Sequence, residues 1–261
     1  MTQATLELLG TGMSHGVPVL GCTCEVCKSQ DSRDQRLRTS ALLRSSNTAI
    51  LFDCGPDFRV QALRAKLNSL TAALISHVHA DHVFGLDDLR VFTESRNLPI
   101  YGSKPAVDDI VEHFNYIFKK TQEGGGKPHF TMRKINANTP IKLNEITLIP
   151  VPLQHDYPDT YGFRFGNTAY LTDLFNLPEE SYELVRGVDN VLIDAVRPGV
   201  SRNHLNFEKA LEIIAKIHPK QAYFIHIDHS MKHTDIQAYI DEYISQRPEM
   251  KDIKVQPGYD G

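Results

Sequence analysis

Four side chains of types that bind metal ions lie within six residues of one another, at His77, His79, Asp81 and His82. They follow the apolar run 72–75, which predicts a buried strand, so the cluster lies on the loop at the carboxyl end of that strand. Three imidazoles and a carboxylate this close would desolvate and repel one another without a shared cation. The alternative is a solvated loop rich in histidine, but the alternation that points His77 and His79 the same way favours a metal site.

Three more candidate ligands, His155, Asp173 and His226, each follow an apolar strand, so their loops can converge at one edge of a core. Each alone would be an ordinary polar residue, and the combination is what indicates a site. Five imidazoles and two carboxylates suit borderline divalent ions such as Zn²⁺, Mn²⁺, Fe²⁺ or Ni²⁺. Seven ligands are too many for one tetrahedral ion and suit two ions that share a carboxylate.

A second candidate metal site lies near the N-terminus, where Cys22, Cys24 and Cys27 form a C-x-C-x-x-C pattern. A closed structural zinc site needs a fourth ligand, and His229 is the best candidate, because it lies three residues after His226 and can face away from the first site. The alternative is three reduced cysteines in a surface loop. Cysteines spaced for a metal rather than for disulfides favour a cytoplasmic protein.

Composition narrows the class of protein. The 261 residues are 41% hydrophobic and 23% charged, with a net charge of −4, which is ordinary for a globular protein and leaves room for one large domain or two small ones. Because no repeat and no long linker divides the chain, we expect a single domain over residues 1–261, and the net charge predicts no basic surface for nucleic acid. Neither a membrane-spanning run nor a secretory signal is apparent. A small phosphate ester is a better candidate partner, and we also consider a homodimer.

Strands alternate with helices along the chain, which predicts an α/β fold. Expected strands cover residues 5–9, 41–44, 49–52, 72–75, 99–102, 131–135, 141–143, 146–150, 161–165, 168–171, 191–193 and 223–225. Expected helices cover residues 58–67, 86–94, 104–119, 178–185, 207–217 and 234–246, with partial helix in 28–38. Asn206 is expected to cap the helix that follows it. Residues 104–130 read as an insertion, helical and then glycine-rich, with a flexible break at 122–127.

The stretch from His77 to His82, followed by His155, Asp173 and His226 in that order, resembles the signature of the metallo-β-lactamase superfamily. The resemblance implies a four-layer αββα sandwich with the metals at one edge. It also implies one ion on His77, His79 and His155 and a second on Asp81, His82 and His226, with Asp173 and a water or hydroxide bridging the two ions.

The cysteine pattern and several further motifs are similar to the phosphoribosyl 1,2-cyclic phosphate phosphodiesterase (PhnP-type) branch of that superfamily. The motifs span nearly the whole chain and include residues 9–12, 16–18, 202–204, 226–229 and 258–261. The resemblance implies a phosphodiesterase in which a metal-bridging hydroxide attacks phosphorus. It implies that His204 binds phosphate or acts as general acid, against a solvated loop histidine as the alternative. Asp81 is the second candidate catalytic residue, as a ligand that also orients the hydroxide. His15 and the long 104–130 segment depart from the branch.

Other polar residues receive simpler interpretations. Asp53 and Asp194 are expected to brace the site loops from behind the ligands. Cys54 is expected to be buried and inert. The remaining histidines are expected at the surface: His113, His129, His218 and His233.

Two competing functions stay open. One is a tRNA 3′-processing ribonuclease, which shares the metal ligands and the phosphodiester chemistry, although residues 104–130 are short and not notably basic for a tRNA-binding arm. The other is a carrier or redox protein that resembles the pyrroloquinoline quinone biosynthesis protein. That class can keep the cysteine pattern, but its active-site ligands tend to be incomplete, whereas all seven are present here.

Overall fold

The computed structural model describes residues 4–120 and 126–261, so most of the predicted glycine-rich break lies outside the described residues. The strands within the described residues form two mixed sheets. The first sheet consists of β1 Thr5–Gly10, β2 Ser40–Arg44, β3 Ala49–Phe52, β4 Ala72–Leu74, β5 Leu98–Gly102 and β6 Phe130–Lys134, in that spatial order. The second sheet, in the order β13 to β7, consists of β7 Ile141–Leu143, β8 Ile146–Leu153, β9 Thr160–Phe165, β10 Thr168–Leu171, β11 Asn190–Asp194, β12 Gln221–Ile225 and β13 Lys254–Pro257.

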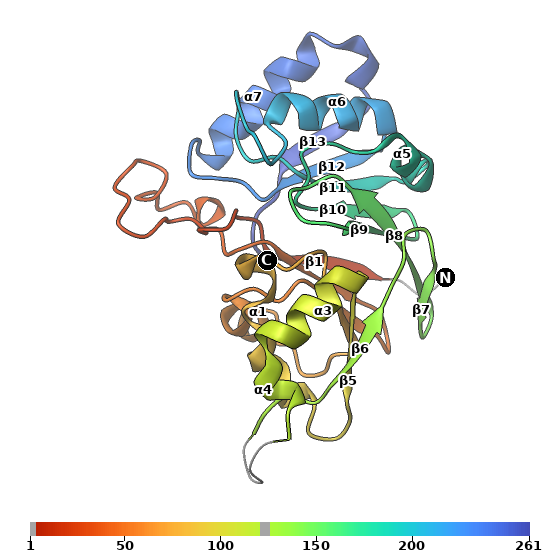
Figure 1. Ribbon diagram of the computed structural model, residues 1–261. Helices are drawn as coiled ribbons and strands as arrows, with labels where there is room; N and C mark the ends of the chain where they lie inside the picture. The colour runs from red at the N-terminus through yellow and green to blue at the C-terminus, as the bar shows by residue number, and fades with distance from the viewer. Residues whose placement is uncertain (1–3, 121–125) are drawn as a thin grey trace.

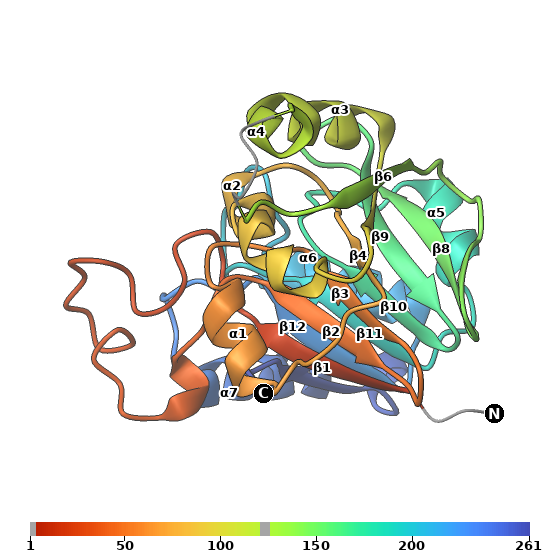
Figure 2. The same ribbon diagram turned by 90° about the horizontal axis from the view of Figure 1, so that it is seen from below.

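Helices cover the outer face of each sheet (Figures 1 and 2). The α-helices are α1 Phe58–Arg64, α2 Ala80–Val83, α3 Lys104–His113, α4 Asn115–Phe118, α5 Glu179–Val185, α6 Phe207–Ile217 and α7 His233–Ser245. Short 3₁₀ helices lie at η1 Ser32–Asp34, η2 Leu86–Phe92 and η3 Pro248–Met250. Figure 1 shows α5, α6 and α7 on one side of the sandwich and α1, α3 and α4 on the other. The predicted αββα arrangement is therefore confirmed.

Three apolar cores correspond to the three interfaces between the four layers. The inner core lies between the sheets, where the ring of Phe52 is 5.5 Å from that of Phe163 and 5.3 Å from that of Tyr170. Successive side chains of a strand point to opposite faces of the sheet, so one strand contributes to two cores. In β2, Leu43 faces the inner core and Leu42 faces the outer one. Both faces of each sheet are thus apolar, which fixes the strands whose ends carry the candidate ligands.

Most predicted elements are present, three of them differ in form, and the predicted exposure of His233 was wrong. The helix expected over 104–119 is broken at Phe114, whose ψ of 36° ends α3 and starts α4. The helix expected over 86–94 is a 3₁₀ helix. The partial helix expected in 28–38 is the short 3₁₀ helix η1, in a loop that runs outside the sandwich (Figure 1). His233 is buried, with 7% of its surface exposed, because it packs beside Arg36 of that loop.

None of the helices in the described residues has the length and apolar character that a membrane crossing requires.

Candidate metal centre

The seven predicted ligands lie at the ends of β4, β8, β10 and β12, or on the short helix α2 that directly follows β4. The loop after β4 places His77 and His79 ahead of α2, and α2 itself carries Asp81 and His82. Close backbone contact keeps α2 in place: a Cβ on Gly55 would lie 2.0 Å from the carbonyl oxygen of Asp81. The loop after β3 therefore has to carry glycine where it passes under the candidate ligands.

Three strand ends use the same uncommon backbone conformation. Asp53 after β3, Asp173 after β10 and His226 after β12 have φ of 59°, 54° and 59°. Residues other than glycine adopt this left-handed backbone region at a cost in free energy, although Asp and His do so more readily than most residues. A residue in this conformation breaks the alternation of the strand. Strained backbone at three residues of one buried site is typical of functional sites.

The first group of ligand atoms contains Nε2 of His77, Nδ1 of His79, Nε2 of His155 and Oδ2 of Asp173. Nδ1 of His79 lies 2.9 Å from Nε2 of His77 and 3.3 Å from Nε2 of His155. Oδ2 of Asp173 lies 3.6 Å from Nε2 of His77. Nitrogen and oxygen ligands of one tetrahedral ion are separated by about 3.3 Å, so this group has the dimensions of a metal site.

The second group contains Oδ2 of Asp81, Nε2 of His82, Nε2 of His226 and, again, Oδ2 of Asp173. Nε2 of His82 lies 3.3 Å from both carboxylate oxygens. Nε2 of His226 lies 3.4 Å from Oδ2 of Asp173 and 3.6 Å from Oδ2 of Asp81. The same oxygen of Asp173 thus belongs to both groups, which is the arrangement needed for one carboxylate to bridge two ions.

The donor atoms of both groups fit divalent cations. In the part of the chain that the structure describes, Nε2 of His82 and Nε2 of His226 make no hydrogen bond, although both atoms are buried beside carboxylate oxygens. Burial disfavours a charge on His82, yet the charges of Asp173 and Asp81 raise its pKa well above the usual value. The carboxylates therefore require a positive charge at this place, and a divalent ion supplies it without a proton.

Further side chains orient the imidazoles by their other nitrogens, as in many metal sites. Nδ1 of His82 donates to Asp53 at 2.9 Å, and Asp53 also accepts from the backbone N–H and hydroxyl of Ser76. Nδ1 of His77 donates to Oγ of Ser76 at 3.0 Å. Nδ1 of His155 donates to the carbonyl oxygen of Asn203 at 3.1 Å. These contacts leave the opposite nitrogens of the three rings facing the site.

His204 lies beside the second group. Its Nδ1 is 2.8 Å from Oδ2 of Asp194, and its ring stacks on His226 with centroids 4.7 Å apart. Burial opposes protonation of His204, but the charge of Asp194 and the hydrogen bond to it raise the pKa to about 9. The pair therefore places a cationic imidazole beside the second group. Asp194 also accepts from the backbone N–H of Leu174, so it connects the loops after β10 and β11.

Two residues that sequence reasoning missed follow His155. Oδ1 of Asp156 lies 2.9 Å from Nε2 of His155, and its side chain is 44% exposed. The ring of Tyr157 lies 6.3 Å from that of His77, and its hydroxyl donates to Asp109 of α3 at 2.6 Å. Their position directly after a candidate ligand was the available signal.

The segment α3–α4 contacts the loop that carries His155 and the residue that follows α2. Besides the bond from Tyr157 to Asp109, the ring of Phe114 lies 6.0 Å from that of Phe84, which directly follows α2. The hydroxyl of Tyr116 donates to Asp87 at 2.6 Å. This segment therefore forms a wall beside the candidate metal centre.

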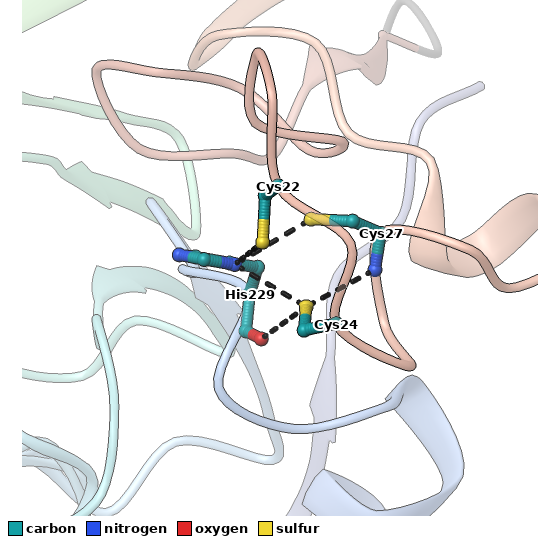
Figure 3. Close-up of side chains that lie close together, drawn as sticks. All are labelled: Cys22, Cys24, Cys27 and His229. Atoms are coloured by element: carbon teal, nitrogen blue, oxygen red, sulfur yellow. Dashed lines mark hydrogen bonds between the residues drawn. The ribbon is translucent and has the colours of Figure 1, made fainter.

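The three cysteines converge on His229 (Figure 3). Their sulfur atoms lie 3.4, 3.5 and 3.4 Å from Nδ1 of His229. Sulfur and nitrogen ligands of one tetrahedral zinc ion are about 3.5 Å apart. The backbone N–H of Cys27 and the ring of His229 lower the pKa of Cys24 to about 6, which favours the thiolate that binds metal. The loop before β2 and the loop after β12 can thus be joined by one ion.

The profile of a family described as a beta-lactamase superfamily domain matches residues 48–227, which is more than half of the chain. A crystal structure of a new diphosphatase from the PhnP family superposes with a TM-score of 0.86 and 35% sequence identity, over 99% of this chain and 96% of the other. The chain belongs to the metallo-β-lactamase superfamily and, within it, to the PhnP family.

Two curated relatives show how far names can be transferred. An octanoyltransferase of Porphyromonas gingivalis is 36% identical over 224 residues, which are 85% of this chain but 45% of that protein. A ribonuclease Z of Listeria monocytogenes is 37% identical over 105 residues, 37% of this chain and 30% of the enzyme. This chain thus spans less than half of the length of either relative. The prediction of a metal-dependent hydrolase is confirmed by the superfamily and the PhnP-family relative together with the His/Asp groups.

Proposed function

We propose that this protein is a dinuclear metal hydrolase that cleaves a phosphoric diester or diphosphate linkage in a small molecule. The observation that carries the proposal is the single oxygen, Oδ2 of Asp173, shared by two complete ligand groups. In this proposal the first ion binds to His77, His79, His155 and Asp173, and the second to Asp81, His82, His226 and Asp173. Two such ions, when bound, activate a water and neutralise charge on phosphoryl oxygens.

The remaining residues bind and orient the substrate. His204, oriented by Asp194, is placed to donate a hydrogen bond to a phosphoryl oxygen or a proton to the leaving oxygen. Asp81 would serve as a ligand of the second ion, and its carboxylate would accept a hydrogen bond that orients the attacking water. We further propose that residues 1–261 act as one domain in which the insertion at 104–130 selects the substrate. The Cys22, Cys24, Cys27 and His229 group serves as a structural zinc site.

The kinship with a PhnP-family diphosphatase supports a phosphorus-containing substrate, and the sequence motifs favour a small cyclic or linear diester. We do not infer acyl transfer from the octanoyltransferase, because this chain matches only 45% of that protein. A tRNA-processing role is less well supported, because the segment nearest the site carries Asp108, Asp109 and Glu112 rather than a basic surface. A carrier role like that of pyrroloquinoline quinone biosynthesis proteins would not require the complete second ligand group.

The test is hydrolysis by the full chain after loading with Zn²⁺, Mn²⁺, Fe²⁺ or Ni²⁺ in separate reactions. Substrates are bis(p-nitrophenyl) phosphate, a five-membered cyclic phosphodiester, an unsymmetrical nucleoside diphosphate diester, a tRNA precursor and an octanoyl thioester. We expect phosphate monoester products from one or more of the first three substrates, followed by ³¹P NMR, and loss of activity on chelation or in Asp81→Ala. Cleavage of the tRNA precursor or the thioester alone would overturn the proposal, as would no turnover with any of the four ions.

A further inference from the structure

One oxygen of Asp173 has no role in the proposed centre, although the other oxygen belongs to both ligand groups. Nε2 of His77, His82 and His226 lie 3.6, 3.3 and 3.4 Å from Oδ2 of Asp173. Oδ1 instead accepts a hydrogen bond from the hydroxyl of Thr172 at 2.7 Å. An ionised carboxylate only accepts hydrogen bonds, so the hydroxyl is the donor. The two oxygens of this carboxylate therefore face different partners.

The contact between Thr172 and Asp173 depends on the uncommon backbone at the end of β10. Successive side chains of a regular strand point to opposite faces of the sheet, so they do not meet. The φ of 54° at Asp173 breaks this alternation, and its carboxylate reaches the hydroxyl of the preceding residue. Thr172 is 0% exposed and Asp173 is 1% exposed, so bulk water does not compete for Oδ1.

We propose that Thr172 is a positioning residue that selects Oδ2 of Asp173 as the oxygen shared by both ions. The assignment rests on the metal centre of the proposed function. The last torsion of an aspartate side chain is broad and weakly restrained by itself. The hydroxyl restrains it by holding Oδ1 away from the imidazoles, and the β-branched side chain of threonine fixes the direction of that hydroxyl. Without the hydroxyl, either oxygen can turn toward either group.

This role differs from that of the other contacts that orient the ligands. Asp53 holds the ring of His82, which belongs to the second group, and the carbonyl of Asn203 holds the ring of His155, which belongs to the first. Each of these contacts acts directly on a ligand of one group. Because Oδ2 belongs to both groups, loss of the Thr172 hydroxyl should weaken both His/Asp positions together.

The test is calorimetric titration of Co²⁺ into the metal-free full-length protein, with absorption spectra recorded in parallel. Thr172→Val keeps the shape of the side chain without the hydroxyl, whereas Thr172→Ser keeps the hydroxyl. We expect Thr172→Val to weaken binding at both His/Asp positions by roughly 10–100-fold. Thr172→Ser should bind Co²⁺ nearly as tightly as the wild type. Thiolate-to-cobalt absorption identifies the ion at the cysteine group, whose affinity should not change.

Thr48→Val is the matched control. Thr48 is buried and its hydroxyl also donates to a carboxylate, that of Glu145, at 3.1 Å. It precedes β3, at the opposite end of that strand from the candidate metal centre. We expect Thr48→Val to bind Co²⁺ as the wild type does. Melting of the metal-free proteins checks folding, and an unfolded Thr172→Val would be replaced by Thr172→Ala.

Equal Co²⁺ affinities for Thr172→Val and Thr48→Val would overturn the assignment, and so would weakening at one His/Asp position alone or an equal loss in Thr172→Ser. The titration does not depend on turnover. The expected Co²⁺ behaviour without hydrolysis of any phosphate ester would therefore contradict the proposed function alone. Hydrolysis by the wild type together with unchanged Co²⁺ binding in Thr172→Val would contradict the role of Thr172 alone.

Discussion

The two candidate metal centres of this protein obtain their ligands in opposite ways. The His/Asp centre draws its ligands from the ends of four strands and from α2, and most of those side chains are buried by two sheets that pack through the inner core. The Cys₃His group draws three of its ligands from a loop whose regular structure is the three-residue η1, and one from the loop after β12. Strand ends are fixed by ladders that form regardless of metal, whereas the cysteine loop has few such restraints.

The comparison indicates that the two centres respond differently to metal removal. The sheets position the His/Asp ligands before any ion arrives, so loss of metal should cost activity more than structure. The cysteine loop depends on its ion to close, so loss of metal should cost local order first. The two centres are also connected, since His226 and His229 lie on one loop and the backbone N–H of Met13 donates to the carbonyl of Ile227.

The largest effect is expected at the oxygen shared by both ligand groups. Asp173→Asn keeps a residue that tolerates φ of 54° but removes the bridging charge. We expect activity to fall by at least about 10³-fold, because both ions lose a ligand. Metal analysis after gel filtration should show loss of the His/Asp ions with zinc retained at the cysteines. Loss of all metals together with unfolding would contradict the separation of the two centres.

A smaller but still large effect is expected from His204. His204→Gln keeps a side chain of similar reach but removes the imidazole beside Asp194, and we expect kcat to fall by about 10²–10⁴-fold. Metal content should stay at the wild-type value, because His204 belongs to neither group that shares Asp173. The matched variant Asp194→Asn should give a smaller loss, since the ring remains but is less well oriented. A wild-type kcat for His204→Gln would show that His204 is a solvated loop residue with no role in the reaction.

The sequence alone allowed the local part of this site to be predicted, because His77 to His82 follow one apolar strand. Convergence of His155, Asp173 and His226 could be expected only as a property of strand ends, and their pairing into two groups rested on a family resemblance. The positive φ at Asp53, Asp173 and His226 has no sequence signal strong enough to predict. It results from tertiary restraints that override local preference.

The elements show the same limit. Apolar periodicity predicted the strands and the major helices, because burial on both faces of a sheet leaves a local pattern. It did not predict the break at Phe114 or the burial of His233, which depend on contacts far apart in the chain. His233 packs against Arg36, which is 197 residues away in the chain. The ring of Phe114 packs against that of Phe84, which directly follows α2. Asp156 was missed because its interest lies in a distance to His155, which no spacing rule reports.

Loss of the ion at the cysteine centre should lower the thermal stability of the protein. Cys27→Ser removes one thiolate, and we expect one fewer zinc ion per chain and a melting temperature several degrees lower. Activity should fall about 10-fold, since the loop that holds His226 loses a brace. Zinc analysis and calorimetry measure both. The control is Asp173→Asn, which should show the reverse pattern: a large loss of activity at nearly unchanged melting temperature. Identical profiles for the two variants would contradict independent roles.

The stability of the protein in acid should depend on buried His233, which lies beside Arg36 of the loop that follows the cysteines. Burial and the charges of Arg36 and Arg33 lower the pKa of His233 to about 4, while Asp31 and Asp34 oppose this and the ring of Tyr259 lies 5.8 Å away. The unfolded chain, with a pKa near 6.5, takes up this proton first as pH falls. Protonation of His233 therefore leaves the free energy of unfolding unchanged above pH 6.5 and lowers it by about 3 kcal/mol as the pH falls from 6.5 to 4.

Urea unfolding of His233→Gln at several pH values isolates this contribution from the titration of carboxylates. We expect a shallower loss of stability between pH 6.5 and 4 than in the wild type. His113→Gln, at an exposed histidine of α3, should follow the wild-type curve. Parallel curves for all three proteins would show that His233 titrates normally in the folded state.

The smallest effect is expected where α3 meets the site. Asp109→Asn weakens the bond from the hydroxyl of Tyr157, which links the wall α3–α4 to the loop that carries His155. A single hydrogen bond to a charged group contributes about 1.5–3 kcal/mol when fully lost, and less when a neutral acceptor replaces it. We therefore expect KM to rise about 3-fold with kcat nearly unchanged, because the proposed role of this wall is to select the substrate, while the metal ligands stay in place. Asp108→Asn, on the same helix but paired with Lys104 and Lys134, is the matched control and should leave KM unchanged. A fall in kcat without a change in KM would instead place Asp109 with the residues that orient His155, and the wall would then belong to the metal centre rather than to substrate selection.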